Sequence, residues 1–195
     1  MDTVIENPTS SCTNTLSSIP YNALSTAEQE QMLSFQQELL GLMAQEIDSA
    51  NLINQICKLA EQYLSNAVAS VMLLDASSAL LNVYAAPSVP AEGIGRLNGL
   101  QPGVGGGSCG NAVFRQEPQF VEDTFNDPRW ENIRQIAHDF NICSCWSMPI
   151  FSSQGNVIGS FALSSFEHRT PGKLHHKLLE IGASLIGKIL DRHKV

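Results

Sequence analysis

The spacing of apolar residues divides the chain into helical and extended segments. Apolar side chains at helical spacing predict a first amphipathic helix over 26–48 and a second from 49 to about 64. Short apolar and β-branched runs then predict strands over 68–75, 79–86, 119–123, 142–151 and 157–166. Helical spacing returns after Pro171 and Gly172 and predicts a closing helix over 173–192.

Local signals mark where several elements begin. Ser25 followed by Glu28 has the pattern of a capping box for the first helix. Asp127 followed by Pro128 favours the start of a further helix, over 129–141. Short polar connections after the first and fourth predicted strands indicate two antiparallel hairpins.

These elements predict an α+β fold with one central antiparallel sheet, flanked by helices and with long helices at both ends. Residues 1–25 contain fourteen Ser, Thr, Asn or Pro and are expected to be a flexible tail. Residues 26–192 then form one domain. The long connection 87–118 between the second and third strands is a suitable place for a small-molecule pocket.

Charge and composition exclude several partners. The net charge is −8, and residues 1–57 hold seven acidic residues and no Lys or Arg. Because that third repels polyanions and no basic stripe follows, nucleic acid is not an expected ligand. The sequence has no apolar run of about 18 residues and no signal peptide pattern, so we expect no membrane span and a cytoplasmic location.

The segment GVGGGSCGNAVFRQ, residues 103–116, holds candidate chemistry. Gly105, Gly107 and Gly110 fit G-x-G-x-x-G, but without a preceding strand a dinucleotide fingerprint is not predicted. A helix beginning near Ser108 would offer free amides to an anion, whereas the alternative role of the glycines is only to permit a tight turn. Cys109 would lie in the first helical turn, which favours a reactive thiolate, or it is simply a small buried residue.

Other cysteines extend this candidate site. The five cysteines of the chain are an odd number without an export signal, so we expect thiols rather than a disulfide framework. Cys143 and Cys145 lie two apart on a predicted strand and should share a face, from which either can approach Cys109. C-x-C alone is a weak metal signal, and no metal site is predicted.

Four further residues complete the list of pocket candidates. Trp130 and Trp146 are candidate apolar walls, with ordinary core packing as the alternative. His138 is the best placed axial ligand for a haem, which is not favoured, since a lone helical histidine more often faces solvent. Asp123 ends the third predicted strand, next to the expected pocket.

The chain resembles the GAF domains of bacterial signalling proteins through GGGSCGNAVFRQEPQFVEDTFNDPRW, CSCWSMPIFSSQGNVIGSFALSSFEHRTP and the closing helix. It is most similar to a subgroup with S-C-G and C-W-S-x-P-I motifs, found N-terminal to histidine kinase or GGDEF/EAL output domains. The resemblance covers about 30–191. It implies a GAF/PAS-like central antiparallel sheet of five to six strands with a ligand pocket over one face. It also implies a homodimer formed by the terminal helices and a covalently linked output domain.

The resemblance also implies a function. We expect a non-enzymatic sensor that binds a small molecule or senses redox state and controls cyclic di-GMP turnover or a histidine kinase. The subgroup pattern favours Cys109 with Cys145 as the redox pair. Bilin is not expected, because bilin-binding GAF domains use a cysteine followed by histidine, which is absent here. The ligand stays unknown, and the alternatives are a thiol enzyme of the free methionine-R-sulfoxide reductase type or a structural dimerisation module.

Overall fold

The computed structural model describes residues 20–192. Its helices are η1 (Tyr21–Ala23), α1 (Thr26–Met43), α2 (Ser49–Glu61), α3 (Ala91–Leu97), α4 (Gly107–Arg115), η2 (Pro128–Trp130), α5 (Arg134–Asp139) and α6 (Lys173–Arg192). Its strands are β1 (Ala67–Leu74), β2 (Leu81–Ala85), β3 (Gln119–Val121), β4 (Ser144–Phe151) and β5 (Val157–Ser165). The predicted α+β class and the five-stranded sheet are confirmed.

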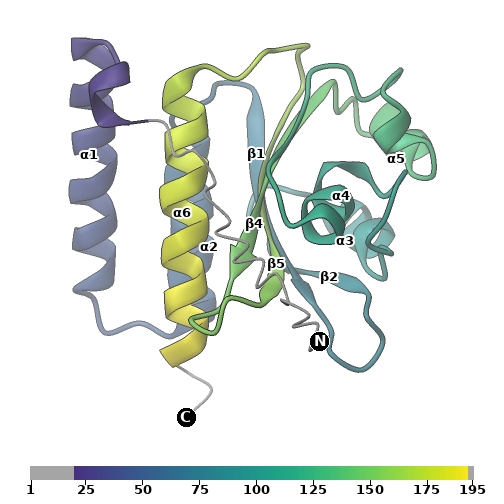
Figure 1. Cartoon of the computed structure of the whole chain (residues 1–195), viewed down its shortest axis with the longest axis horizontal. Helices are drawn as coiled ribbons and strands as arrows, with labels where there is room; N and C mark the ends of the chain where they lie inside the picture. Colours follow the sequence, from purple (N-terminus) through teal and green to yellow (C-terminus); the bar gives the residue numbers. More distant parts are fainter. Residues whose placement is uncertain (1–19, 193–195) are drawn as a thin grey trace, which may run out of the picture.

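The five strands form one antiparallel sheet in the order β2-β1-β5-β4-β3. Both predicted hairpins are present, as β1 with β2 and β4 with β5. Figure 1 shows α2 and α6 against one face of the sheet with α1 outside them, and α3, α4 and α5 gathered on the opposite face. The long connection between β2 and β3 therefore covers one face, and the terminal helices cover the other.

Because successive strand residues point to opposite faces, the sheet separates two apolar regions. On the helix side, Trp146, Met148 and Ile150 of β4 join one large core with residues of α1, α2 and α6. On the other side, Cys145 of β4 and Ala162 of β5 belong to a smaller cluster beneath α4 and α5. β4 is consequently buried on both faces over nearly its whole length.

Two glycines let α6 lie close to the sheet. A Cβ atom on Gly182 would lie 2.5 Å from Cε1 of Phe161, on β5. A Cβ atom on Gly187 would lie 2.3 Å from the carbonyl oxygen of Phe151, on β4. Since no real Cβ atom tolerates such distances, α6 is seated on β4 and β5 at a separation that only glycine permits.

His175 stabilises the start of α6 through a ring contact and a hydrogen bond. Its ring lies 5.1 Å from that of Trp146, and its Nδ1 accepts a hydrogen bond of 3.1 Å from the backbone N–H of Gly172. Burial lowers the pKa of His175, while a hydrogen bond with the backbone of Tyr63 acts in the opposite direction. The other charged or titratable groups that influence it are Arg169, His176 and Glu28. The contacts of His175 therefore require a neutral imidazole.

The capping box at Ser25 and Glu28 is confirmed, but the first helix is shorter than predicted. Asp48 adopts an extended conformation and accepts a hydrogen bond from the N–H of Asn51 as the cap of α2, so the helical conformation has to end before it. Part of the predicted tail is also ordered: η1 forms within it, and Leu24 is buried in the helix-side core. The rest of the tail, residues 1–19, lies outside the described residues.

The predicted helix over 129–141 is divided into η2 and α5. Asp127 caps η2 as expected, by accepting a hydrogen bond from the N–H of Arg129. The division occurs at Asn132, whose N–H donates to the carbonyl of Gly105 rather than to a preceding helical turn. This bond ties the glycine segment to the segment before α5.

Candidate functional site

A cavity of about 250 Å³ lies between the sheet and the connecting helices. Its wall is formed by β1, α3 and the residues around it, the start of α4, η2, α5, and parts of β4 and β5. Among the described residues that line it there is no Asp, Glu, Lys, Arg or His. Apart from two cysteines and the four serines at 70, 88, 108 and 164, the lining consists of glycine, proline and large apolar side chains.

The glycines at the start of α4 are required by backbone conformation and by close contacts. Gly105 and Gly107 have φ values of +88° and +67°, which residues with a Cβ rarely adopt. A Cβ atom on Gly106 would lie 2.6 Å from the carbonyl oxygen of Gln101, and one on Gly107 would lie 2.5 Å from Cδ1 of Ile133. The tight-turn interpretation of this segment is supported directly, and the turn brings α4 onto the cavity.

Ser108 joins three parts of the site. Its hydroxyl donates to the carbonyl of Cys145 at 2.8 Å and accepts from Nε1 of Trp130 at 3.1 Å. All three residues are buried. This pair of hydrogen bonds fixes α4 to β4 and holds the Trp130 indole in the cavity wall.

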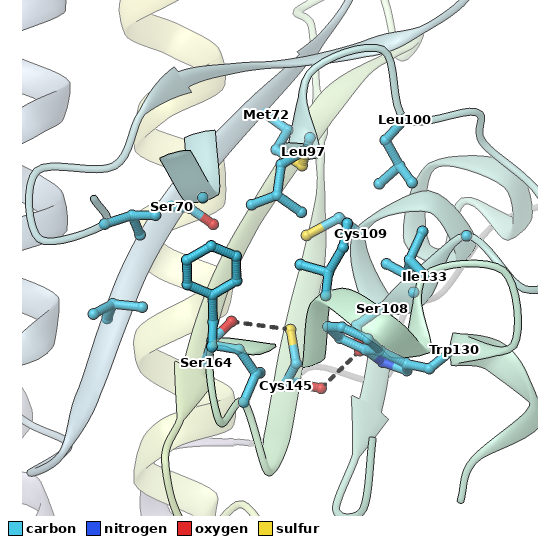
Figure 2. A pocket seen from close by; sticks show the side chains of 18 of the residues that line it. Ser70, Met72, Leu97, Leu100, Ser108, Cys109, Trp130, Ile133, Cys145 and Ser164 are labelled. Carbon is cyan, nitrogen blue, oxygen red and sulfur yellow. Dashed lines mark hydrogen bonds between the residues drawn. The ribbon is translucent and has the colours of Figure 1, made fainter. Parts of the chain in front are cut away.

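Two thiols face the same space. Figure 2 shows the side chains of Cys109, from α4, and Cys145, from β4, both directed into the cavity. Cys109 is partly exposed and accepts a hydrogen bond of 3.6 Å from the hydroxyl of Ser147. Cys145 is 2% exposed and accepts one of 3.3 Å from the hydroxyl of Ser164. The two thiols also interact with each other.

This interaction separates the two thiol pKa values. The Cys145 thiol and, to a smaller extent, the Ser160 and Ser147 hydroxyls lower the pKa of Cys109 to about 7, while burial acts in the opposite direction. The same hydrogen bond to Cys109, together with burial, raises the pKa of Cys145. As the pH rises, Cys109 therefore loses its proton before Cys145 does.

The structure brings together five of the residues proposed from sequence. Gly107, Ser108, Cys109, Trp130 and Cys145 all line the cavity. Cys109 is the third residue of α4, within the first turn as expected. The described lining holds no cationic side chain that would support anion binding at the start of α4. It favours uncharged molecules instead.

Cys143 and Trp146 are placed elsewhere. β4 begins at Ser144, so Cys143 precedes the regular strand and its thiol donates to the carbonyl of Phe166 at 3.4 Å. The expectation that Cys143 faces the pocket with Cys145 was wrong for this reason. Trp146 faces the helix-side core, because strand alternation turns it away from the side to which Cys145 points.

The other three candidates also lie outside the cavity wall. Gly110 packs against the backbone of residues 101–103. Asp123 accepts hydrogen bonds from the N–H of Phe125 and from Asn126, in a surface turn. His138 is exposed and stacks on Phe125 at a centroid distance of 4.5 Å, so it does not reach the cavity as an axial haem ligand.

Several lining residues were missed from sequence. Leu97 belongs to α3, a helix that was not predicted, and Phe140 ends α5. Val68, Ser70 and Met72 line the cavity from alternate positions of β1. Their period of two was available in the sequence, whereas nothing indicated which face of β1 the connecting helices would cover.

Within residues 20–192 no three or more His, Cys, Asp or Glu side chains gather in a way that could hold a metal ion. None of the helices over the same range is both long enough and apolar enough to cross a membrane.

Comparison with known proteins identifies the family. The family model of the GAF domain matches residues 46–191, so the chain belongs to the GAF domain family. A methyl sulfide methyltransferase-associated sensor of Methanosarcina acetivorans is 29% identical over 164 residues. The match covers 84% of this chain but 16% of that sensor, so the chain spans a small part of its curated relative.

Solved structures show the same fold at lower identity. The GAF domain of a phosphoenolpyruvate-protein phosphotransferase from Coxiella burnetii aligns with a TM-score of 0.71 and 16% identity, covering 87% of this chain and 97% of that one. The free methionine-R-sulfoxide reductase from Neisseria meningitidis, in complex with its substrate, aligns with a TM-score of 0.66 and 19% identity. That alignment covers 88% of this chain and 96% of the reductase.

Proposed function

We propose that this chain is a non-enzymatic sensory GAF domain whose cavity binds a small, uncharged and mostly apolar molecule. The observation that carries the proposal is the cavity of about 250 Å³ without a charged side chain in its described lining. An anionic ligand would lose its hydration there and gain no ion pair, which costs several kcal/mol. An apolar ligand gains about 25 cal/mol for each Å² that it removes from water.

The sheet offers a route from the cavity to the output. Cys145 lines the cavity, and its neighbour Trp146 packs among the terminal helices on the other face. A ligand that shifts β4 would therefore also shift α6, which rests on β4 and β5 through Gly182 and Gly187. As part of a longer protein, α6 would pass this shift to a C-terminal output domain, for which a histidine kinase or cyclic di-GMP turnover is the candidate.

A homodimer through the terminal helices is part of this proposal. Leu33 and Leu40 of α1 are 51% and 66% exposed, and they line a groove together with Ile181 and Leu185 of α6. Light scattering after size exclusion should give a dimer for the wild type and a monomer for the double variant Leu33→Lys, Leu40→Lys. Phe114→Lys, which changes a 58% exposed side chain on α4, is the control and should stay dimeric. A dimer that survives the double variant contradicts this interface.

Ligand binding is tested with pairs of molecules that share a ring and differ in charge. We expect cyclohexanone and benzyl alcohol to raise the melting temperature, and cyclohexanecarboxylate and benzoate to leave it unchanged. Ser70→Phe should abolish the shift, because its ring fills the cavity from β1. Thr170→Phe adds the same ring at an exposed position and should retain it. If no uncharged compound binds, a structural dimerisation module becomes the better description.

A thiol-based reductase is the second candidate, favoured by the contact between Cys109 and Cys145. In such a reaction the Cys109 sulfur would accept the sulfoxide oxygen and become a sulfenic acid, while the sulfoxide is reduced to the sulfide. The Cys145 thiol would then attack the Cys109 sulfur, which releases the oxygen as water and forms a disulfide. Free methionine sulfoxide is a zwitterion, and the described lining holds no charge to bind it. We therefore expect no turnover with dithiothreitol as reductant. Turnover that is lost in Cys109→Ser or Cys145→Ser would establish the enzyme instead.

A further inference from the structure

Cys109 differs from the other described cysteines in access. Its side chain is partly exposed to the cavity, whereas Cys57 is 0% exposed in the helix-side core and Cys145 is 2% exposed. The thiol of Cys143 donates to the carbonyl of Phe166 outside the cavity. Of the two cysteines that line the cavity, Cys109 is therefore the more accessible to a bound molecule.

The surroundings of Cys109 favour nucleophilic attack. The Ser147 hydroxyl and the Cys145 thiol both stabilise negative charge on its sulfur. Burial and the hydrogen bond to Cys109 raise the pKa of Cys145, so the second thiol holds its proton and does not compete as a nucleophile. Two cysteines thus line a wall that is otherwise mostly apolar, and Cys109 is the one that ionises more readily.

We propose that Cys109 captures small, uncharged α,β-unsaturated carbonyl compounds as covalent adducts inside the cavity. This inference rests on the proposed function, because the same cavity first has to bind the compound. It goes further by assigning a covalent step and a class of electrophile. Carbonyl compounds of this class are neutral, mostly apolar and have a single acceptor oxygen, which matches a lining of apolar side chains and serine hydroxyls.

The step balances without a further reactant. The Cys109 sulfur forms a bond to the β carbon while the π electrons of the C=C bond move to the carbonyl oxygen as an enolate. The α carbon then takes up a proton, equal to the one released when Cys109 ionised. The net change is addition of the thiol S–H across the double bond, and no oxidant, reductant or leaving group is involved.

The thiolate of Cys109 sets the expected rate. At pH 7 a thiol with a pKa of about 7 is about half ionised, against about 1% for one at the ordinary value of 9.0. A less basic thiolate is a weaker nucleophile, which reduces the gain to about fivefold. Because the compound first binds in the cavity, the rate of adduct formation should saturate as the concentration of the compound rises. The reaction of a free thiol shows no such saturation.

The experiment uses 2-cyclohexen-1-one as the probe on the full chain in a Cys12→Ser background. Intact-mass spectrometry should show one adduct, formed about fivefold faster than with N-acetylcysteine, and fragmentation should place it on Cys109. Cys109→Ser should abolish the adduct, and the matched control Cys143→Ser should retain it. Cyclohexanone, which is not electrophilic, should slow the reaction by competition. If Cys109→Ser does not fold, fragmentation of the adduct formed without that substitution still identifies the modified residue.

A charge comparison completes the test. The ratio of alkylation rates for iodoacetamide over iodoacetate should be at least about tenfold greater at Cys109 than for N-acetylcysteine, because the described lining disfavours the anion. If cyclohexanone binds but no adduct forms on Cys109, this proposal fails and the proposed function stands. If an adduct forms without saturation or competition, the reaction is that of an ordinary surface thiol and the proposal is overturned.

Discussion

The close contact of α6 with the sheet predicts that Gly187→Ala destabilises the protein, although helix propensity alone predicts the opposite. In an exposed helix, replacing glycine by alanine stabilises by about 1 kcal/mol, because alanine restricts the unfolded chain and favours the helix. At Gly187 the added Cβ would lie 2.3 Å from the Phe151 carbonyl oxygen and 3.4 Å from Cγ2 of Ile150. The first of these neighbours is the backbone of a central strand, which cannot turn aside as a side chain can.

The two effects differ enough in size to decide the sign. Overpacking a core costs about 1–3 kcal/mol, and a rigid backbone neighbour places Gly187→Ala near the upper end of that range. Subtracting the propensity gain leaves a net loss of about 2 kcal/mol. For a chain of this size that corresponds to a fall in melting temperature of about 4–8 °C.

Gly41 supplies the matched control. It lies within α1, and a Cβ atom there would have nothing within 4 Å. Gly41→Ala should therefore gain about 0.5–1 kcal/mol, so the two alanine variants should differ by about 3 kcal/mol in urea denaturation followed by circular dichroism. If Gly187→Ala is as stable as Gly41→Ala, the close seating of α6 on β4 is not a constraint and the reasoning is refuted.

Two further predictions concern the site and the start of α6. Ser108→Ala should lower the free energy of unfolding by about 1–3 kcal/mol in urea denaturation, because it leaves the buried Nε1–H of Trp130 without its acceptor; an unchanged midpoint would contradict this. The pKa of His175 is lowered in the folded state from its ordinary value of 6.5. As the pH falls through 6.5, the unfolded state therefore takes up a proton more readily than the folded state, and the free energy of unfolding decreases. The loss in melting temperature between about pH 7.5 and 5.5 should shrink in His175→Asn but not in His168→Asn, an exposed position; equal losses in both would show that His175 is not responsible.

Local sequence signals predicted the elements that carry strong patterns. The strands, both hairpins and the range 173–192 of α6 follow from periodicity and turn residues, which act over a few neighbouring positions. α3 was missed because it is short, contains Gly93 and Gly95, and has Pro90 at its N-cap, which supplies no side-chain hydrogen bond. The division at Asn132 depends on a hydrogen bond to Gly105, a distant partner that no local pattern shows.

The site was predicted in part for the same reason. The glycines before α4 and the position of Cys109 in the first turn are local features, and both were predicted. Trp146 was assigned to the wrong side of the sheet, although its position next to Cys145 already implied the opposite face by strand alternation. The absence of charge in the described lining depends on residues from six or more separate segments, which only the fold brings together.

The division of the molecule by its sheet also bears on how such a domain can change over time. The cavity side and the helix side have separate apolar cores, and they share the backbone of β4 and β5 but few side chains. Substitutions in the cavity wall can therefore accumulate without weakening the packing of α1, α2 and α6. A descendant of this chain could therefore acquire a cavity of different shape and still keep the packing of its terminal helices against the sheet.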